Sequence, residues 1–340
     1  RYPSANLLRR RAFKKMVGSV SDGAETLGAE WSELLLRVPK PEQKRVDALL
    51  AKLETAIPCD PNIHEFLVEK RPDAIVVSPM VGIGFTQADF VKSARALGIP
   101  SGMLVFSWDN LSNKGLIHET PDRMFVWNDI QAHEARKLHK YPNERIVMTG
   151  ASRSDEFFEM RPATTREEFC RIAGFDPARP IITYLGSSKF VAAAEQDFVT
   201  RWISELRRST DPALAGCSLL VRPHPAGEKG WHAEHSIDHR WPNVGEKATL
   251  SRPFGHERAI VMNSPMQNAD VVLYDTVFHS AAIVGLNTSA EIEAAIVGRP
   301  VFTIVDSNAR GQEGTLHFHY LLRANGGHVE LGGGFDEHRL

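Results

Sequence analysis

The sequence predicts an α/β protein with two domains, each built around a mostly parallel sheet. The chain has 340 residues, which is more than one ordinary hydrophobic core accommodates. Short apolar runs rich in β-branched residues alternate with segments of helical periodicity, beginning with the run at 74–78. This alternation pauses in the charged, proline-rich stretch 161–180 and then restarts. We therefore expect a first domain over residues 1–160 and a second over residues 161–340.

The first domain is expected to hold four strands with helices between them. The expected strands are residues 74–78, 102–106, 123–127 and 145–149, and the expected helices are residues 41–55, 88–97 and 130–139. A complete domain of this type opens with a strand and a helix, and neither is evident before residue 74. Because the chain starts at Arg1 and not at Met, we expect that a first βα unit is missing upstream.

The second domain repeats the pattern. The expected strands are residues 181–185, 218–222, 281–284 and 301–305, and the expected helices are residues 198–208 and 289–297. Residues 270–274 suit either a short strand or the end of a helix. The sequence thus favours a doubly wound sheet in each domain.

Composition narrows the class of protein. The formal net charge is -2, which argues against a general nucleic-acid binder. Cys59, Cys170 and Cys217 lie far apart, which favours a reducing compartment, and neither a secretory leader nor a bilayer-long apolar run is evident; we expect a cytoplasmic protein. The first fifteen residues hold six basic and no acidic side chains, which suits a solvated arm or a peripheral membrane contact.

A polar turn before the last expected helix is the strongest candidate for an anion site. Asn287, Thr288 and Ser289 follow a strand, and the helix then carries Glu291 and Glu293. Free backbone N–H groups and the helix dipole favour a phosphate at such a turn, and a carboxylate one turn later can bind ribose hydroxyls. In the simpler alternative, Thr288 or Ser289 is an N-cap, and the two glutamates are first-turn acids that the helix dipole favours.

Two further loops follow expected strands of the second domain. Arg222 and His224 stand in an Arg-Pro-His-Pro segment, where the guanidinium and the imidazole can donate to an anion and the prolines stiffen the loop. A strand-end turn with a surface histidine is the alternative. Ser187 and Ser188 come after the first strand of this domain, directly behind Gly186.

The stretch from Glu293 to Val301, together with the segments just described, resembles the GT-B glycosyltransferases and their relatives, the UDP-N-acetylglucosamine 2-epimerases and CDP-glycerol glycerophosphotransferases. Its letters EAAIVGRPV match the E-A-x-x-x-G-x-P-V pattern usual in that group. The resemblance implies two Rossmann-like domains facing a cleft. It also implies donor phosphates near Ser187, Ser188, Arg222, His224, Asn287, Thr288 and Ser289, and a ribose at Glu293. Many relatives have a glycine pair where this chain has Leu286 and Asn287, so the chain departs from the usual pattern of the phosphate turn.

The first domain offers a candidate acceptor site at residues 107–115, after its second strand. Trp108 presents a flat apolar face for a sugar ring, while Asn110 and Lys114 are polar contacts. Asp109 is the candidate general base. In the alternative, Asp109 and Asn110 form an Asx turn and Trp108 belongs to the core.

A last cluster lies near the C-terminus. The resemblance implies that Glu313 and Thr315 contact the donor sugar. His317 and His319 could bind a metal with Glu313, but no further ligand has suitable spacing, so we expect neither a metal nor another cofactor. Neither a G-x-S-x-G elbow nor a P-loop lysine motif occurs, which weighs against a hydrolase or an ATPase.

The function that we expect is a metal-independent glycosyltransferase. It would move a sugar from a UDP-, GDP- or CMP-linked donor to a carbohydrate or lipid-linked acceptor, in the assembly of a bacterial surface polysaccharide. Three alternatives remain open: a nucleotide-sugar 2-epimerase, a CDP-alcohol phosphotransferase and a non-catalytic binding module of the same fold.

Overall fold

The computed structural model describes two compact units, which the chain forms over Arg1–Ala151 and Ser152–Leu340. The described residues are 56–80, 87–108, 110–114, 117, 119–188, 192, 195–224, 236–241, 247–254, 258–263, 271–286 and 288–304, with 39, 42, 45, 46, 48, 49 and 52. The division lies close to the expected boundary at residue 160. The expected cleft between the domains stays a prediction.

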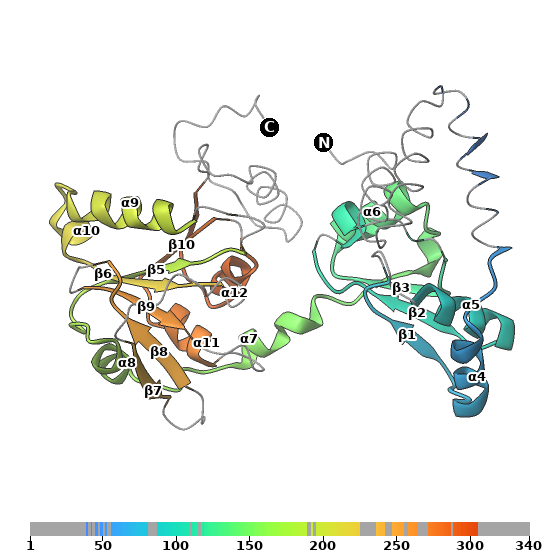
Figure 1. Ribbon diagram of the computed structural model, residues 1–340, viewed down its shortest axis with the longest axis horizontal. Helices are drawn as coiled ribbons and strands as arrows, with labels where there is room; N and C mark the ends of the chain where they lie inside the picture. Colours follow the sequence, from blue (N-terminus) through green and yellow to red (C-terminus); the bar gives the residue numbers. More distant parts are fainter. Residues whose placement is uncertain are drawn as a thin grey trace, which may run out of the picture. The chain divides into compact units, whose positions relative to one another are not determined.

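The first unit has a four-stranded parallel sheet in the order β1-β2-β3-β4 (Figure 1). Its elements are α4 (Pro61–Lys70), β1 (Ile75–Val77), α5 (Gln87–Leu97), β2 (Ser101–Leu104), the π-helix η1 (Asn110–Lys114), β3 (Arg123–Val126), α6 (Asp129–His139), the short 3-10 helix η2 (Asn143–Arg145) and β4 (Ile146–Met148). All four expected strands and the helices at 88–97 and 130–139 are confirmed.

The strand order of this sheet places its described helices on one face. Consecutive parallel strands joined by right-handed crossovers always put the connecting helix on the same side. The buried strand residues Val77, Met103, Val105, Met124 and Val126 accordingly pack with Val91 of α5 and with Ala132 and Ala135 of α6. On the opposite face Val76 is 62% exposed and Val147 is 38% exposed, and the Phe125 ring lies close to Gly102. Within the described part of the first unit, this face of the sheet therefore carries exposed apolar side chains.

The second unit has a seven-stranded sheet in the order β11-β10-β5-β6-β9-β8-β7. Its elements are the 3-10 helix η3 (Ser152–Ser154), α7 (Asp155–Glu159), α8 (Arg166–Ala173), β5 (Ile181–Leu185), α9 (Glu195–Arg207), α10 (Pro212–Gly216), β6 (Ser218–Arg222), β7 (Ile237–Arg240), β8 (Lys247–Ser251), β9 (Ala259–Asn263), α11 (Val271–Phe278), β10 (Ala282–Gly285), α12 (Ala290–Ile296) and β11 (Val301–Thr303). Strands β11, β10, β5, β6 and β9 are parallel, and β8 and β7 are antiparallel additions.

The winding of this sheet reverses at β5. From β5 the chain proceeds to β6 and β9 on one side, and it returns through α11 to place β10 and β11 on the other side. The helices consequently cover both faces: α9 and α10 lie on one side of the sheet, and α8 and α11 lie on the other (Figure 1). The expected doubly wound α/β fold is confirmed for this unit.

Several elements of the second unit were not expected from the sequence. Residues 271–278 are helical, which settles the open choice at 270–274, and the junction 161–180 contains α8, which packs into the core. Strands β7, β8 and β9 were missed. β7 lies at the sheet edge with mostly exposed residues, so it lacks the apolar run of a buried parallel strand. In β8 the alternation of buried Ala248 and Leu250 with polar neighbours was a usable signal.

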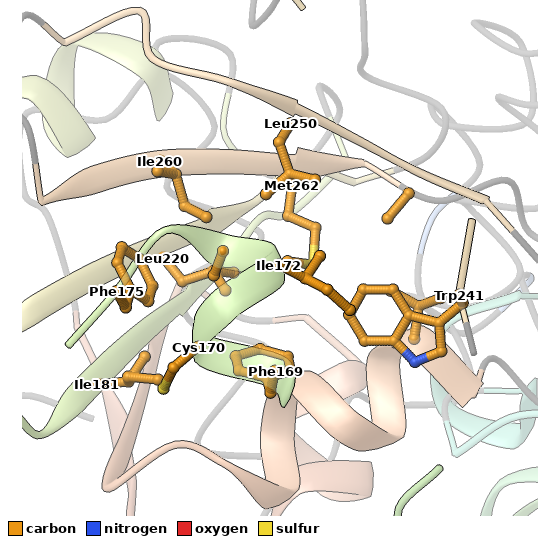
Figure 2. Close-up of a cluster of buried hydrophobic side chains, with 13 residues drawn as sticks. Phe169, Cys170, Ile172, Phe175, Ile181, Leu220, Trp241, Leu250, Ile260 and Met262 are labelled. Atoms are coloured by element: carbon orange, nitrogen blue, oxygen red, sulfur yellow. The ribbon is translucent and has the colours of Figure 1, made fainter. Parts of the chain in front are cut away.

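The core on the α8 side is organised around two aromatic rings (Figure 2). Phe169 of α8 and Trp241 after β7 meet edge to face, with ring centroids 5.9 Å apart, and both are almost fully buried. Ile172, Leu250 and Met262 surround them. This contact ties α8 to the antiparallel edge of the sheet.

Asp275 in α11 is the polar centre of the same region. Its carboxylate is fully buried and accepts three hydrogen bonds, from the Ala163 backbone N–H at 2.8 Å, the Thr164 hydroxyl at 2.7 Å and the Trp241 indole N–H at 2.9 Å. The His279 imidazole lies 2.9 Å from the Thr164 carbonyl oxygen, and burial lowers the pKa of His279. One side chain thus joins the segment before α8, the segment after β7, and α11.

Asp275→Ala is expected to destabilise the protein strongly. The substitution removes the acceptor of two buried donors, the Thr164 hydroxyl and the Trp241 indole, and of the part-buried Ala163 N–H. Each buried donor left without an acceptor costs about 1–3 kcal/mol. We expect the free energy of unfolding to fall by about 3 kcal/mol or more, measured by urea denaturation with tryptophan fluorescence. Asp238→Ala is the control, because the exposed Asp238 carboxylate accepts one bond from the Thr249 hydroxyl at 2.7 Å. Equal losses in the two variants would contradict the anchoring role of Asp275.

Candidate functional site

Four strands of the second sheet end at the same level. The register pairs Thr303 of β11 with Gly285 of β10, Gly285 with Leu185 of β5, and Leu185 with Arg222 of β6. The segments that follow these residues therefore emerge side by side at the carboxyl edge of the sheet. The reversal of winding falls between β10 and β5, and ligands of open α/β sheets bind outside the carboxyl ends at such a reversal.

The β5 loop, which begins with residues 186–188 directly after β5, passes very close to the end of β6. The Gly186 N–H donates to the Arg222 carbonyl oxygen at 2.8 Å, and a Cβ on Gly186 would lie 2.8 Å from the His224 backbone nitrogen. Only glycine fits this approach. The next residue, Ser187, is buried, and its hydroxyl donates to the Leu286 carbonyl oxygen in the β10 loop. The loops after β6, β5 and β10 are thus directly connected, which brings the predicted residues Ser187 and His224 to one edge.

The β10 loop is held by Glu291. This side chain is 1% exposed; one carboxylate oxygen accepts from the Thr288 N–H at 3.1 Å and the other accepts from the Thr303 hydroxyl at 2.6 Å. A Cβ on Gly285 would overlap the Glu291 carboxylate. The expectation of a free N–H at Thr288 is therefore wrong, because Glu291 occupies it in the manner of a capping box. Glu293 is half-buried on the same helix, and its assignment to a ribose stays a prediction.

Two side chains at this edge can donate to an anion. Arg222, the last residue of β6, is 7% exposed, and His224 is half-buried. Burial lowers the pKa of His224, so at neutral pH the imidazole is uncharged and offers a single N–H. Ser188 is half-buried and Ser289 is exposed. Among its described residues, the carboxyl edge thus carries the Arg222 guanidinium, the neutral His224 imidazole and hydroxyl groups.

Glu195 is the residue of this edge that the sequence reasoning missed. It begins α9 and is 6% exposed, and its Oε1 accepts from the Ser187 N–H at 2.7 Å and from the Tyr184 hydroxyl at 2.9 Å. Burial raises the pKa of Glu195 to about 7, although both hydrogen bonds lower it in part. From the sequence, an acidic residue in the first turn of a helix is ordinary, so nothing marked Glu195 for burial.

The first unit also gathers polar groups at the carboxyl edge of its sheet. After β1, the Gln87 side chain accepts from the Met80 N–H and donates to the Ser78 carbonyl oxygen, both at 2.7 Å. Met80 has φ 57°, an uncommon conformation for a residue other than glycine. Strained backbone of this kind is concentrated at functional sites, so the β1 loop supports a site at this edge.

The loop after β2 contains the π-helix η1, another rare feature that is frequent at functional sites. Asn110 is 2% exposed, and its side-chain oxygen accepts from the N–H groups of Phe106 and Ser107 at 2.7 and 2.8 Å. These bonds run to the backbone before Asn110 and not to the residues after it, so they are not the Asx turn of the alternative, and the role of Asn110 as a ligand contact stays a prediction. Trp108 is half-buried. The His139 ring supports the loop, accepting from the Ile117 N–H at 3.2 Å and lying 2.6 Å from the Leu111 carbonyl oxygen.

Several predicted site residues lie outside what the structure describes. They are Asp109, Asn287, Glu313, Thr315, His317 and His319, and the side chain of Lys114, whose backbone is in η1. Their roles stay predictions. Glu119, a carboxylate between β2 and β3, lies at the amino edge of the first sheet and is paired with Arg95 at 2.8 Å.

Metal binding and membrane insertion were searched only within the described part of the chain. There, no group of three His, Cys, Asp or Glu side chains is arranged to hold a metal ion. Within the same residues, no helix combines the length and apolar character that crossing a bilayer requires.

The comparison with protein sequences gives one partial match. No protein-family model matches the chain. The chain is 24% identical over 196 residues to secreted mono- and diacylglycerol lipase 3 of Gibberella zeae. The match covers 52% of this chain and 56% of the lipase, so the chain spans little more than half the length of this curated relative.

The comparison with solved structures finds proteins of the group that the motifs resemble. The UDP-GlcNAc 2-epimerase from Methanocaldococcus jannaschii has a TM-score of 0.48 at 12% identity, covering 88% of this chain and 78% of that one. The wall teichoic acid polymerase TagF has a TM-score of 0.31 at 14% identity, covering 54% and 38%. At these identities the likeness concerns the fold and not the activity.

The raised pKa of Glu195 predicts how stability depends on pH. A carboxyl group whose pKa is higher in the folded protein than its ordinary 4.5 costs stability once it ionises. This cost is complete above about pH 7, shrinks as the pH falls, and vanishes below about pH 4.5. We expect Glu195→Gln to be more stable than the wild type at about pH 8, by about 1.4 kcal/mol for each unit of pKa displacement.

Chemical denaturation at a series of pH values measures this difference. The stability gap between Glu195→Gln and the wild type should close steadily toward about pH 5. Glu205→Gln is the matched control on the exposed side of α9, paired only with Arg208 at 3.1 Å, and should show no such trend. A gap that does not change with pH would show that Glu195 is not the titrating group.

Proposed function

We propose that the chain is a glycosyltransferase that binds a nucleotide-linked sugar at the carboxyl edge of the second sheet. The observation that carries the proposal is that β10, β5 and β6 end at the same level of the sheet, where its winding reverses. The donor residues expected from sequence motifs follow these strand ends directly. Three separate motifs that converge on the edge where such sheets bind ligands support a shared ligand.

The chemistry of this edge suits a diphosphate linked to a ribose. Arg222 can bind phosphate oxygens in a bidentate manner, and His224 and the hydroxyls of Ser188 and Ser289 can donate single hydrogen bonds. Since Glu195 and Glu291 occupy the N–H groups of Ser187 and Thr288, these side chains would carry most of the phosphate binding. Glu293 remains the candidate for the ribose.

The acceptor is proposed to bind at the carboxyl edge of the first sheet, near Trp108 and η1. A rare helical form and a strained residue at adjacent strand ends support a site there. Asp109 is the proposed general base. Guanidinium and neutral donors can stabilise the leaving diphosphate without a metal ion, which is the basis for proposing metal independence.

Donor binding is tested by thermal unfolding with UDP, GDP, CDP and their sugars. A ligand that binds only the native state stabilises it, by about 2.7 kcal/mol at a hundredfold excess over Kd. We expect a rise in Tm with one of these bases, and at least about tenfold weaker binding in His224→Ala and in Glu293→Ala, the change that loss of one good interaction produces. Glu205→Ala should bind normally. Wild-type affinity in both site variants would place the ligand elsewhere.

Catalysis is tested with Asp109→Asn, which preserves size and removes the base. Turnover, followed as nucleotide release in the presence of acceptor, should fall by about 10²-fold or more, the scale of general-base catalysis. Donor binding and Tm should stay close to wild type. A folded variant with normal turnover would contradict the assignment. Formation of the 2-epimer of the donor sugar without any acceptor would identify an epimerase instead.

A further inference from the structure

Glu195 is joined by hydrogen bonds to the loops after β5 and β10, where the donor phosphates are proposed to bind. The carboxylate holds the Ser187 N–H, and the Ser187 hydroxyl donates to the Leu286 carbonyl oxygen of the β10 loop. A single residue therefore separates Glu195 from the point where the β5 and β10 loops meet. An anion bound by these two loops comes close to a buried acid.

The geometry allows Glu195 to gain a proton without losing either hydrogen bond. Both the Ser187 N–H and the Tyr184 hydroxyl donate to the same oxygen, Oε1. A proton on Oε2 leaves Oε1 as a carbonyl acceptor for both donors. Protonation thus removes the charge and preserves the position of the β5 loop.

Charge and burial decide whether a bound anion favours the protonated or the ionised form of Glu195. Burial already brings the pKa of Glu195 to about 7, so the protonated and ionised forms are close in free energy at neutral pH. A nearby negative charge disfavours a second one, and its effect is larger where water is excluded. Filling the site with a diphosphate would therefore raise the pKa of Glu195 further.

We propose that Glu195 takes up one proton from solvent when a nucleoside diphosphate or its sugar ester binds at this edge, so that affinity and protonation are linked. The proposal rests on the proposed donor site. Glu195 acts here as a positioning residue for Ser187, and its proton removes the repulsion that an ionised carboxylate would exert on the ligand.

Other ionisable groups at this edge could accept the same proton. Among the residues that the structure describes, they are His224 after β6, and Glu291 and Glu293 of α12. His224 is the chief competitor, because burial lowers its pKa and a bound anion would raise it. The experiment must therefore separate His224 from Glu195.

The test is isothermal titration calorimetry with UDP-N-acetylglucosamine, whose diphosphate ester does not titrate near neutrality. Titrations of the full chain at about pH 7.5, in two buffers of different ionisation enthalpy, give the number of protons taken up. We expect uptake of most of one proton, and a Kd that rises by up to about tenfold per pH unit above neutrality. In Glu195→Gln the uptake should disappear while the Kd at neutral pH stays within about threefold of wild type, since the neutral amide keeps the Oε1 acceptor.

Matched variants make each outcome decisive. His224→Gln and Glu291→Gln should retain the uptake, and Tyr184→Phe should shift its maximum to higher pH by removing a bond that lowers the pKa of Glu195. Uptake that persists in Glu195→Gln and vanishes in His224→Gln would overturn the proposal. Tight binding without proton uptake would overturn it and leave the proposed function intact, whereas no binding of this probe or of its GDP and CDP counterparts would overturn both.

Discussion

The reversal of winding at β5 is the constraint on which the rest of the second unit depends. Parallel strands joined by right-handed crossovers place each connecting helix according to the direction of travel. Because travel reverses at β5, the crossover helices α9 and α11 lie on opposite faces of the sheet. The helix α8, which precedes β5, packs on the same face as α11, and both faces are buried. The same reversal sends the loops after β5 and β10 in different directions from adjacent strand ends, which is why polar segments distant in sequence meet there.

Two buried glutamates determine the conformation of the loops after β5 and β10 where they meet. Glu195 holds the β5 loop and Glu291 holds the β10 loop, each through a backbone N–H that a phosphate could otherwise have used. The arrangement fixes the loops before any ligand arrives, which lowers the entropy lost on binding. Under the proposed function, phosphate recognition would then fall to side chains such as Arg222 and His224 and not to these two backbone N–H groups. Rigid loops and side-chain recognition are therefore two results of one set of contacts.

The parts of the structure that were predictable are those encoded by local pattern. Most of the parallel strands were evident because each is a short apolar run, although β9, which is also parallel and apolar, was missed. Following the recognised runs to their ends located Ser187 and Arg222 at one edge of the sheet. The edge strand β7 was not evident, since its IDHR sequence is mostly exposed and has no apolar periodicity. Nor was the burial of Glu195 or Glu291, because it arises from contacts with Tyr184 and Thr303, which only the folded sheet brings near.

The exposed apolar side chains of the first sheet have a consequence for dividing the chain. The second unit buries both faces of its sheet, so a fragment that begins near Ser152 carries its own complete set of layers. A fragment ending near Ala151 would expose Val76 and Val147 on an apolar surface, which favours self-association. Of the two halves, the C-terminal one is therefore the better choice for separate expression and for spectroscopy.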